Sequence, residues 1–173
     1  IRELGPVLTA LMVIGRAGSA ITAEIGIMRI TEQIDALRSM AVDPIRYLMV
    51  PRLIAGVIAM PLLTALFIVV GIAGGYGVGV GLLNLSSGTF MSQMISAVTG
   101  VDVFSGLIKA AVFGFIFGWV SCYKGYTATG GALGVGETVK STSVFTLVAI
   151  IVADFSVSLF VSFIQDFIGT GIH

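Results

Sequence analysis

Three ionisable residues interrupt long apolar stretches of the sequence: Arg16 and Glu24 in one stretch, and Asp154 in another. A charge within a membrane-spanning segment costs on the order of 3 kcal/mol unless it is paired or faces a protein interior. Arg16 and Glu24 are eight residues apart, which is too far for a direct pair along one straight helix. We therefore expect each to have a partner elsewhere, with Asp154 as the acidic partner of Arg16.

Such charges can serve two kinds of chemistry. Ion pairs hold helices together, whereas carboxylates such as Glu24 and Asp154 carry protons or sodium in an ion-coupled secondary transporter. Inverted repeats would favour that transporter, and the sequence shows no convincing internal repeat. We favour the structural pair and keep ion-coupled secondary transport as the alternative. Lys109 lies near the predicted outer end of a span, where a lysine can snorkel to water, so we assign it no function.

Catalytic and metal-binding residues are scarce. Cys122 and His173 are the single cysteine and histidine, so a disulfide or a Cys/His metal site lacks ligands. Ser19 stands in Gly-Ser-Ala rather than in a Gly-x-Ser-x-Gly elbow. The glycines from Gly125 to Gly136 are not followed by the Gly-Lys-Ser or Gly-Lys-Thr of a phosphate loop. The sequence predicts a non-catalytic chain that binds no metal or cofactor and does not hydrolyse ATP itself.

Composition points to a membrane rather than to water. Hydrophobic residues make up 57% of the chain, charged residues 10%, and the mean hydropathy is +1.09. Soluble domains average about 45–50% apolar and 25% charged residues. The formal net charge is zero, so we expect no nucleic-acid partner. The chain opens at Ile1 in an apolar segment without a signal-peptide pattern, and we expect it to be a fragment whose N-terminal part is absent.

Four charge-poor segments are long enough to cross a bilayer as helices, which takes about 20 residues. They run from about Gly5 to Met28, Leu53 to Leu83, Val103 to Tyr123 and Thr142 to Gln165. The predicted fold is therefore an all-α integral membrane protein with about four transmembrane helices. Between the second and third spans, apolar residues from Phe90 to Val98 recur at helical spacing. They indicate a short amphipathic helix, with an ordinary loop as the alternative.

Basic residues orient the four spans. Arg29, Arg38, Arg46 and Arg52 follow the first span, Lys124 and Lys140 follow the third, and residues 84 to 102 contain none. The positive-inside rule places both basic connections in the cytoplasm and the chain's C-terminus outside.

The first cytoplasmic connection has the pattern of an amphipathic helix. Apolar residues at Ile30, Ile34 and Leu37 repeat at three- and four-residue spacing, and charged residues face elsewhere. We expect Thr31 to cap its start and Asp43-Pro44 to stop it. Such a helix could press into a groove of a cytoplasmic motor or rest on lipid headgroups, and the pattern leaves both readings open.

Glycines recur at four-residue spacing in two of the predicted spans. Gly71, Gly75 and Gly79 form one run, and Gly114 and Gly118 form another. Small residues at this spacing let helices approach closely, so we expect packing surfaces at both runs. A hinge at Gly74-Gly75 is the alternative for the first run.

Several motifs together resemble the MlaE (YrbE-type) permease family. They lie mainly in the first third of the chain, with a last group in the second basic connection. These motifs are Arg2-Glu3-Leu4-Gly5-Pro6, Gly15-Arg16-Ala17-Gly18-Ser19-Ala20, Thr22-Ala23-Glu24-Ile25-Gly26, Glu32-Gln33-Ile34-Asp35-Ala36-Leu37, Met40-Ala41-Val42-Asp43-Pro44, Pro51-Arg52, Tyr123-Lys124-Gly125-Tyr126 and Gly134-Val135-Gly136. The resemblance extends over essentially all of residues 1–173, which we read as a single permease domain lacking the family's N-terminal helix and first span.

The resemblance implies an assembly and a cargo. It implies a homodimeric ABC transporter permease in the inner membrane of a Gram-negative cell, bound to two cytoplasmic ATPase subunits and to a periplasmic ring protein with MCE domains. The expected cargo is phospholipid passing between inner and outer membranes, which maintains outer-membrane lipid asymmetry. ATP and Mg²⁺ are then used by the ATPase partner and not by this chain.

The resemblance also assigns sites. The short cytoplasmic helix becomes the coupling helix that contacts the ATPase, through Glu32, Gln33, Ile34, Asp35, Leu37, Arg38 and Met40. Arg2, Glu3 and Leu4 become candidates for the substrate site near a lipid cavity at the dimer interface. A cationic side chain there could pair with a lipid phosphate. The alternative is that the Arg2 and Glu3 charges only mark the membrane boundary.

Overall fold

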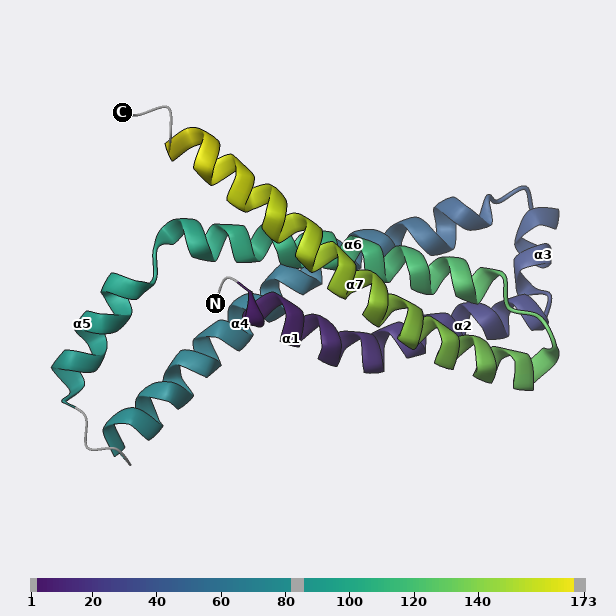
Figure 1. The fold of residues 1–173 in the computed structure, drawn as a ribbon. Helices are drawn as coiled ribbons and strands as arrows, with labels where there is room; N and C mark the ends of the chain where they lie inside the picture. The colour runs from purple at the N-terminus through teal and green to yellow at the C-terminus, as the bar shows by residue number, and fades with distance from the viewer. Residues whose placement is uncertain (1–2, 82–85, 170–173) are drawn as a thin grey trace.

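Four long helices dominate the computed structural model, which describes residues 3–81 and 86–169, with side chains as far as residue 163. Each is long and apolar enough to cross a membrane: Leu4–Ile30, Ile45–Gly81, Gly100–Tyr126 and Gly131–Phe163. No strand forms within the described ranges. The predicted all-α fold with four spans is confirmed (Figure 1).

Two of the spans contain a five-residue π-helical segment. The first span joins α1, η1 and α2, and the second joins η2 and α4; α6 and α7 form the third and fourth. Their bounds are α1 Leu4–Val13, η1 Ile14–Gly18, α2 Ser19–Ile30, η2 Ile45–Met49, α4 Val50–Gly81, α6 Gly100–Tyr126 and α7 Gly131–Gly169. A π segment shifts the helical register, so residues on either side of it present different faces.

The second and fourth spans begin earlier than predicted, at Ile45 rather than Leu53 and at Gly131 rather than Thr142. Charged residues were read as span ends, but these helices continue through them beyond the apolar core. The 37 residues of Ile45–Gly81 would measure about 55 Å, whereas the hydrocarbon layer is about 30 Å thick. The predicted end of the second span at Leu83 lies outside the described residues.

The short helix predicted between the first two spans is present as α3 (Gln33–Ser39), but the prediction that Thr31 caps its start is wrong. The Thr31 hydroxyl instead donates backwards to the carbonyl of Ile27 at 2.8 Å, at the C-terminal end of α2. Threonine side chains often bond to the carbonyl four residues earlier, which removes them as caps of a following helix. The chain turns into α3 at Glu32, whose φ of 59° is left-handed.

The predicted stop at Asp43-Pro44 is also wrong. Helix α3 already ends at Ser39, and Ala41 follows with a left-handed φ of 60°. Asp43 and Pro44 begin the next helix, because the Asp43 carboxylate accepts the Ile45 backbone N–H at 3.0 Å. Aspartate before a helix and proline in its first turn are favoured starts.

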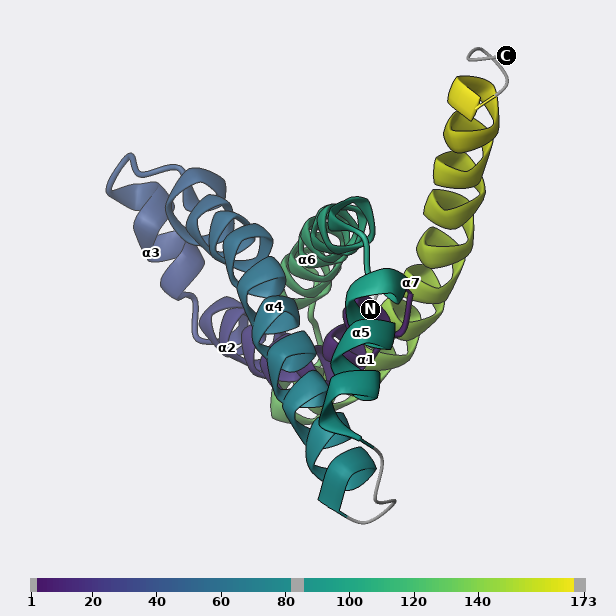
Figure 2. The same cartoon turned by 90° about the vertical axis from the view of Figure 1, so that its left-hand side faces the viewer.

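Helix α6 is the centre of the bundle. It contacts α1, α2, α4 and α7, and Figure 2 shows it between α4 and α7. Two groups of buried residues pack around these contacts. One lies in the middle of the bundle, and the other lies toward the end that carries α3, which we call the basic end. They consist of Ala10, Ile14, Met60, Phe113, Phe117 and Ile150, and of Ile25, Ile34, Leu48 and Cys122.

The two glycine runs differ in their contacts. A Cβ at Gly114 would lie 2.5 Å from the Gly56 carbonyl oxygen, and one at Gly118 would lie 3.5 Å from Leu53, so α6 packs closely on α4 as predicted. Cβ atoms at Gly71 and Gly75 would meet nothing within 4 Å, so within the described chain these two do not form the predicted packing surface. Helix α4 runs through Gly74 and Gly75 unbroken.

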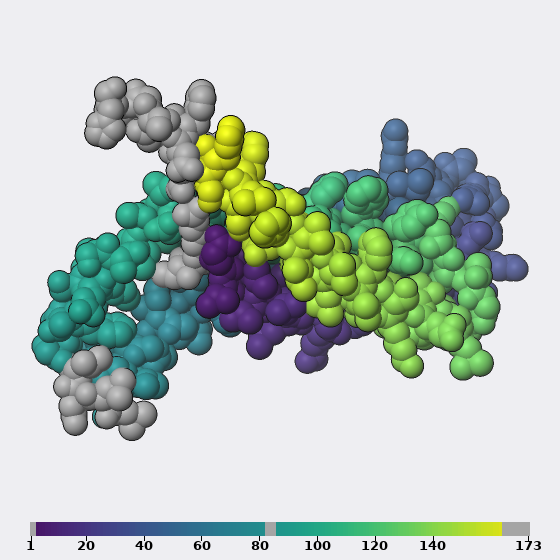
Figure 3. All heavy atoms as spheres, viewed as in Figure 1, coloured from purple at the N-terminus to yellow at the C-terminus, as the bar shows by residue number. Residues whose placement is uncertain are grey.

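The helices are close together at the basic end and splay apart at the other. Figures 1 and 2 show the second half of α4 and the second half of α7 diverging in different directions. In the space-filling view, α7 crosses the face beside α1 (Figure 3), and Figure 2 shows its second half leaving the bundle. The bundle therefore has one compact end and one open end.

A short helix, α5 (Ser87–Ala97), lies at the open end and confirms the predicted amphipathic helix over the loop. It packs on the end of α4 through Tyr76 and Phe90, whose rings meet edge to face with centroids 5.6 Å apart. None of its residues is buried.

Replacing Gly114 with alanine tests the close contact between α4 and α6. The new Cβ would meet the Gly56 carbonyl, so the helices must separate, and we expect a loss of about 1–3 kcal/mol of stability. Thermal unfolding of the purified protein in detergent measures it. Gly136→Ala, a helical site where a Cβ meets nothing within 4 Å, is the control and should be neutral or slightly stabilising. Equal unfolding temperatures for the two variants would contradict the contact.

Candidate functional site

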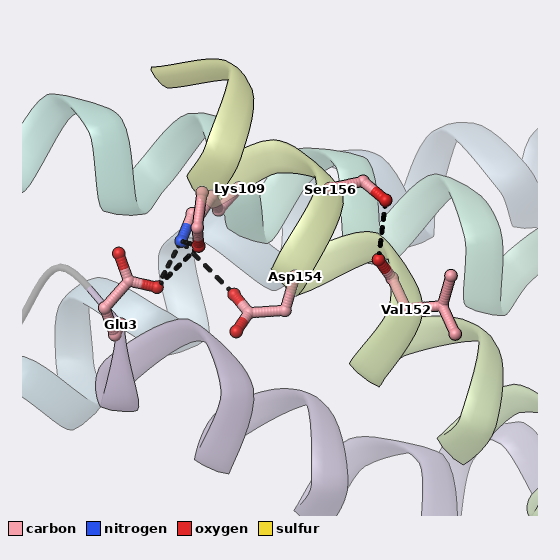
Figure 4. Close-up of polar contacts among 6 residues, drawn as sticks. Glu3, Lys109, Val152, Asp154 and Ser156 are labelled. Atoms are coloured by element: carbon pink, nitrogen blue, oxygen red, sulfur yellow. Dashed lines mark hydrogen bonds and ion pairs between the residues drawn. The ribbon is translucent and has the colours of Figure 1, made fainter. Parts of the chain in front are cut away.

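A buried lysine lies at the start of the open end. The side chain of Lys109, on α6, is 1% exposed. Its ammonium pairs with Glu3, lies 3.2 Å from Asp154 Oδ1 and donates to Ser158 Oγ at 2.6 Å. The Ser158 hydroxyl in turn donates to Glu3 Oε2 at 2.9 Å. We call these four residues the ion cluster; Figure 4 shows Glu3, Lys109 and Asp154 pointing toward one another.

Three helices position the ion cluster. Glu3 immediately precedes α1, and Asp154 and Ser158 are four residues apart on α7, so they share one face of that helix. Lys109 lies on the face of α6 that carries Gly106, Ala110 and Phe113, all buried. The cluster thus joins α1, α6 and α7 where the bundle begins to open.

Within the ion cluster the cation is buried, whereas the two carboxylate side chains are partly exposed. Glu3 is 46% exposed and Asp154 25% exposed, against 1% for Lys109. A buried lysine needs such partners, because an unpaired charge in an apolar interior is very costly. The arrangement fixes the ammonium, and part of the Asp154 side chain stays accessible from the open end.

The predicted pairing of Asp154 with Arg16 is wrong, because Asp154 pairs with Lys109. Lys109 does not snorkel to water either. Arg16 lies 13 residues after Glu3 in the first span, about 20 Å along the helix. Asp154 is held at the level of Glu3 and so lies far from Arg16.

The other two charges that were predicted to lie within a span differ in whether they have a partner. Glu24 finds a partner on another helix, as expected, because Arg52 Nη2 on α4 donates to Glu24 Oε1 at 2.6 Å. The Arg16 guanidinium is exposed and, among the described residues, makes no hydrogen bond or ion pair. It sits in the π segment η1, in the middle of the first span.

Two of the three predicted substrate-site residues, Glu3 and Leu4, lie at the open end. Arg2 lies outside the described residues. Glu3 belongs to the ion cluster, and Leu4, 68% exposed, lines an apolar hollow of about 390 Å³. Residues of α1, α4 and α5 form its walls: Leu4, Gly5, Leu8, Phe67, Ile68, Gly71, Ile72, Gly75, Phe90 and Met94. Glu3 of the ion cluster and Leu4 of the apolar hollow are therefore consecutive residues.

Sequence reasoning missed Lys109 and Ser158. The spacing of Lys109 with Gly106, Ala110 and Phe113 puts it on the glycine-bearing face of α6, which was already expected to pack. That was a usable signal that Lys109 points inward rather than to lipid.

The residues of the predicted coupling helix lie at the compact end and divide into two groups. Ile34 is fully buried and Leu37 half-buried against the bundle, whereas the other five are exposed: Glu32, Gln33, Asp35, Arg38 and Met40. Ile34 packs with Ile25, Leu48 and Cys122. Ile34 and Leu37 therefore anchor α3, and its polar face is turned outward.

Polar contacts tie α3 to its neighbours. Asp35 Oδ1 accepts from Arg29 at 3.3 Å and from Arg38 at 3.4 Å. Arg38 also donates to the Tyr126 hydroxyl, and the Arg29 guanidinium carbon lies 5.7 Å from the centroid of the Tyr126 ring. Tyr126 is the last residue of α6, so α3 is joined to the helix that carries Lys109.

Replacing Lys109 with methionine tests the ion cluster. Glu3 and Asp154 would lose their buried cation, and because both carboxylates are partly exposed we expect a loss of about 1–3 kcal/mol rather than the cost of a fully buried pair. We expect a clearly lower unfolding temperature in detergent. Lys140→Met, the same change at an exposed lysine, should leave it unchanged. A Lys109→Met protein as stable as the Lys140→Met protein would show that the cluster does not hold the helices together.

Comparison with known proteins identifies the family to which this sequence is similar. A family model described as "Permease MlaE" matches residues 1–160. A probable ABC transporter permease protein of Rickettsia bellii is 46% identical over 157 residues, covering 91% of this chain and 61% of the relative. The chain thus spans about three-fifths of the length of such relatives.

Two further relatives are similar to the same region. The intermembrane phospholipid transport system permease protein MlaE of Haemophilus influenzae is 45% identical, covering 90% of this chain and 60% of that protein. The chloroplastic protein TRIGALACTOSYLDIACYLGLYCEROL 1 of Arabidopsis thaliana is 44% identical, covering 92% and 45%. With a family model matched over residues 1–160 and relatives this similar, the chain belongs to the MlaE permease family.

Proposed function

We propose that this chain forms the lipid pathway of an ABC transporter that moves phospholipids between the inner and outer membranes of a bacterium, maintaining outer-membrane lipid asymmetry. The observation that carries the proposal is the open end, where the ion cluster adjoins an apolar hollow. The printed name of the Haemophilus influenzae relative, a phospholipid transport permease, supports the cargo.

The open end suits an amphiphile. The hollow lined by Leu4, Leu8 and Phe67 offers apolar surface to an acyl chain. The partly exposed Asp154 carboxylate of the ion cluster offers oxygen atoms to a cationic or hydroxyl group of a headgroup, and Arg2 adds a cation suited to phosphate. Arg2, Glu3 and Leu4 remain our proposed substrate-binding residues, with Lys109 and Asp154 holding Glu3 in place.

The driving subunit would act at the compact end. The exposed face of α3 offers a docking surface to a cytoplasmic ATPase, which binds ATP and Mg²⁺ and supplies the energy; this chain binds no cofactor. Since Arg38 contacts Tyr126, a movement of α3 would pass directly to α6. We therefore assign coupling to Glu32, Gln33, Asp35, Arg38 and Met40, with Ile34 and Leu37 as anchors.

The remaining parts of the proposal concern assembly. We propose a homodimer in the bacterial inner membrane, with ATPase subunits in the cytoplasm, an MCE-domain ring protein outside and no nucleic-acid partner. Two outward features support a second copy: the open glycine face of α4 at Gly77 and Gly81, and the exposed Arg16 in mid-span. Small residues allow close helix approach, and a mid-span arginine favours a protein or water-filled surrounding over lipid.

Ion-coupled secondary transport is the less supported alternative. Its carriers would be Glu24 and Asp154, and each of these carboxylates is already paired with a cation, Arg52 and Lys109 respectively. Each pair joins two helices, which supports a structural role for both carboxylates.

Reversing charge on α3 tests the docking surface. The double variant Glu32→Lys/Asp35→Lys turns the acidic face basic, and we expect the ATPase to be lost from the purified complex while membrane insertion survives. Co-purification in mild detergent measures this. Glu137→Lys, a charge reversal at an exposed acid on α7, is the control and should keep the ATPase. Retention of ATPase and transport by the double variant would refute the docking assignment.

Removing one hydroxyl tests the link from α3 to α6. Tyr126→Phe loses the contact with Arg38 and keeps the ring beneath Arg29. We expect ATPase binding to persist while lipid transported per ATP hydrolysed falls several-fold, measured in proteoliposomes of the full complex. Tyr123→Phe, an exposed tyrosine one turn earlier, is the matched control. An unchanged ratio in Tyr126→Phe would show that coupling takes another route.

A further inference from the structure

A second amphiphilic surface lies at the compact end, on the outside of α6 and α7. Trp119, Val120, Tyr123, Lys124 and Phe145 line a hollow of about 410 Å³. A neighbouring hollow shares Phe145 and is lined by Lys140, Ser141, Val144 and Val148. We call the two together the α6–α7 groove. It is far along α6 from the ion cluster, since Lys109 is 15 residues before Lys124.

The groove carries positive charge without an internal counterion. The Lys124 ammonium lies 5.6 Å from the centroid of the Phe145 ring, and Lys140 is exposed. Among the described residues neither lysine forms an ion pair with a carboxylate, although Glu137 is one turn from Lys140. The arginines of α2, α3 and η2 at the same end contrast with them, because Arg29, Arg38 and Arg46 all pair with aspartates.

The side chains of the groove change from apolar to aromatic to cationic along its length, in the same order as the parts of a lipid. Trp119 and Tyr123 are 61% and 59% exposed, and Val148 is 56% exposed. Tryptophan and tyrosine are enriched where hydrocarbon meets headgroups. Lys124 follows Trp119 by five residues, about 8 Å toward the basic end of the helix. The apolar part therefore faces the depth of acyl chains, and the lysines face the depth of phosphates.

We propose that the α6–α7 groove binds an anionic phospholipid of the cytoplasmic leaflet, with its acyl chain along Trp119 and Val148 and its phosphate between Lys124 and Lys140. Charge complementarity selects this occupant. A zwitterionic lipid brings its own cation, whereas a lipid such as phosphatidylglycerol brings the net negative charge that two unpaired lysines lack. The site is separate from the proposed transport pathway and does not depend on it.

Trp119 is the single tryptophan of the 173 residues, and it reports directly on the groove. The full permease is reconstituted in vesicles of unbrominated phosphatidylcholine containing increasing brominated phosphatidylglycerol or brominated phosphatidylcholine. Bromine quenches tryptophan on contact, and a Trp119→Phe protein identifies the signal that belongs to Trp119. We expect half-maximal quenching at an about tenfold lower mole fraction of brominated phosphatidylglycerol than of brominated phosphatidylcholine.

Substitutions distinguish specific binding of an anionic lipid in the groove from general attraction of anionic lipids to the positively charged end of the protein. Lys124→Gln/Lys140→Gln should bring the two lipids to equal quenching, and Lys124→Arg/Lys140→Arg should keep the preference. Arg46→Gln, which removes one charge from the same end but outside the groove, should also keep it. Equal quenching in the unaltered protein, or a preference that survives in the double glutamine variant, overturns the proposal. Absence of quenching by either lipid does so too, because it would mean that protein covers the groove.

Discussion

The arrangement of the open end depends on the burial of one ammonium group. Lys109 is on the central helix and is enclosed, so α1 and α7 must bring oxygen atoms to it. Between helices in lipid there is little hydrophobic driving force, because acyl chains are as apolar as leucine. The ion cluster supplies a directional attraction at the level where α4 and α7 begin to diverge, and so limits how far α7 can leave the bundle.

Glycine explains why the two ends differ. Near the middle and the compact end, glycines meet neighbouring helices: a Cβ at Gly125 would lie 2.9 Å from the Thr22 carbonyl, and one at Gly26 would lie 3.0 Å from Val135. Toward the open end of α4, Gly71, Gly74 and Gly77 meet nothing within 4 Å. Glycines thus permit close contact in the packed part of the bundle, and those in the second half of α4 leave bare helix. The result is a closely packed base beneath an open end.

The spans could be predicted from the sequence, and the partners of the charges could not. Hydropathy identified all four helices and periodicity identified α3 and α5, because both signals are local. The pairing of Asp154 depends on which helix lies beside α7 and at what depth, and neither is encoded within the span itself. The prediction that Thr31 caps α3 was wrong for a different reason. A threonine hydroxyl can bond to a backbone group of the following turn or of the preceding one, and the choice depends on the left-handed turn at Glu32.

Helix α6 offers a physical route between the two ends. Tyr126 at its last turn contacts Arg38 of α3, and Lys109, 17 residues earlier, holds the ion cluster. That separation is about 25 Å along a continuous helix, which transmits displacement with little bending. Between the two points Gly114 rests on Gly56, and this backbone contact leaves no flexible side chain to absorb the motion. In the coupling that we propose, a shift of α3 would be relieved by tilting α6 about that contact, which would move Lys109 and with it the carboxylates of α1 and α7.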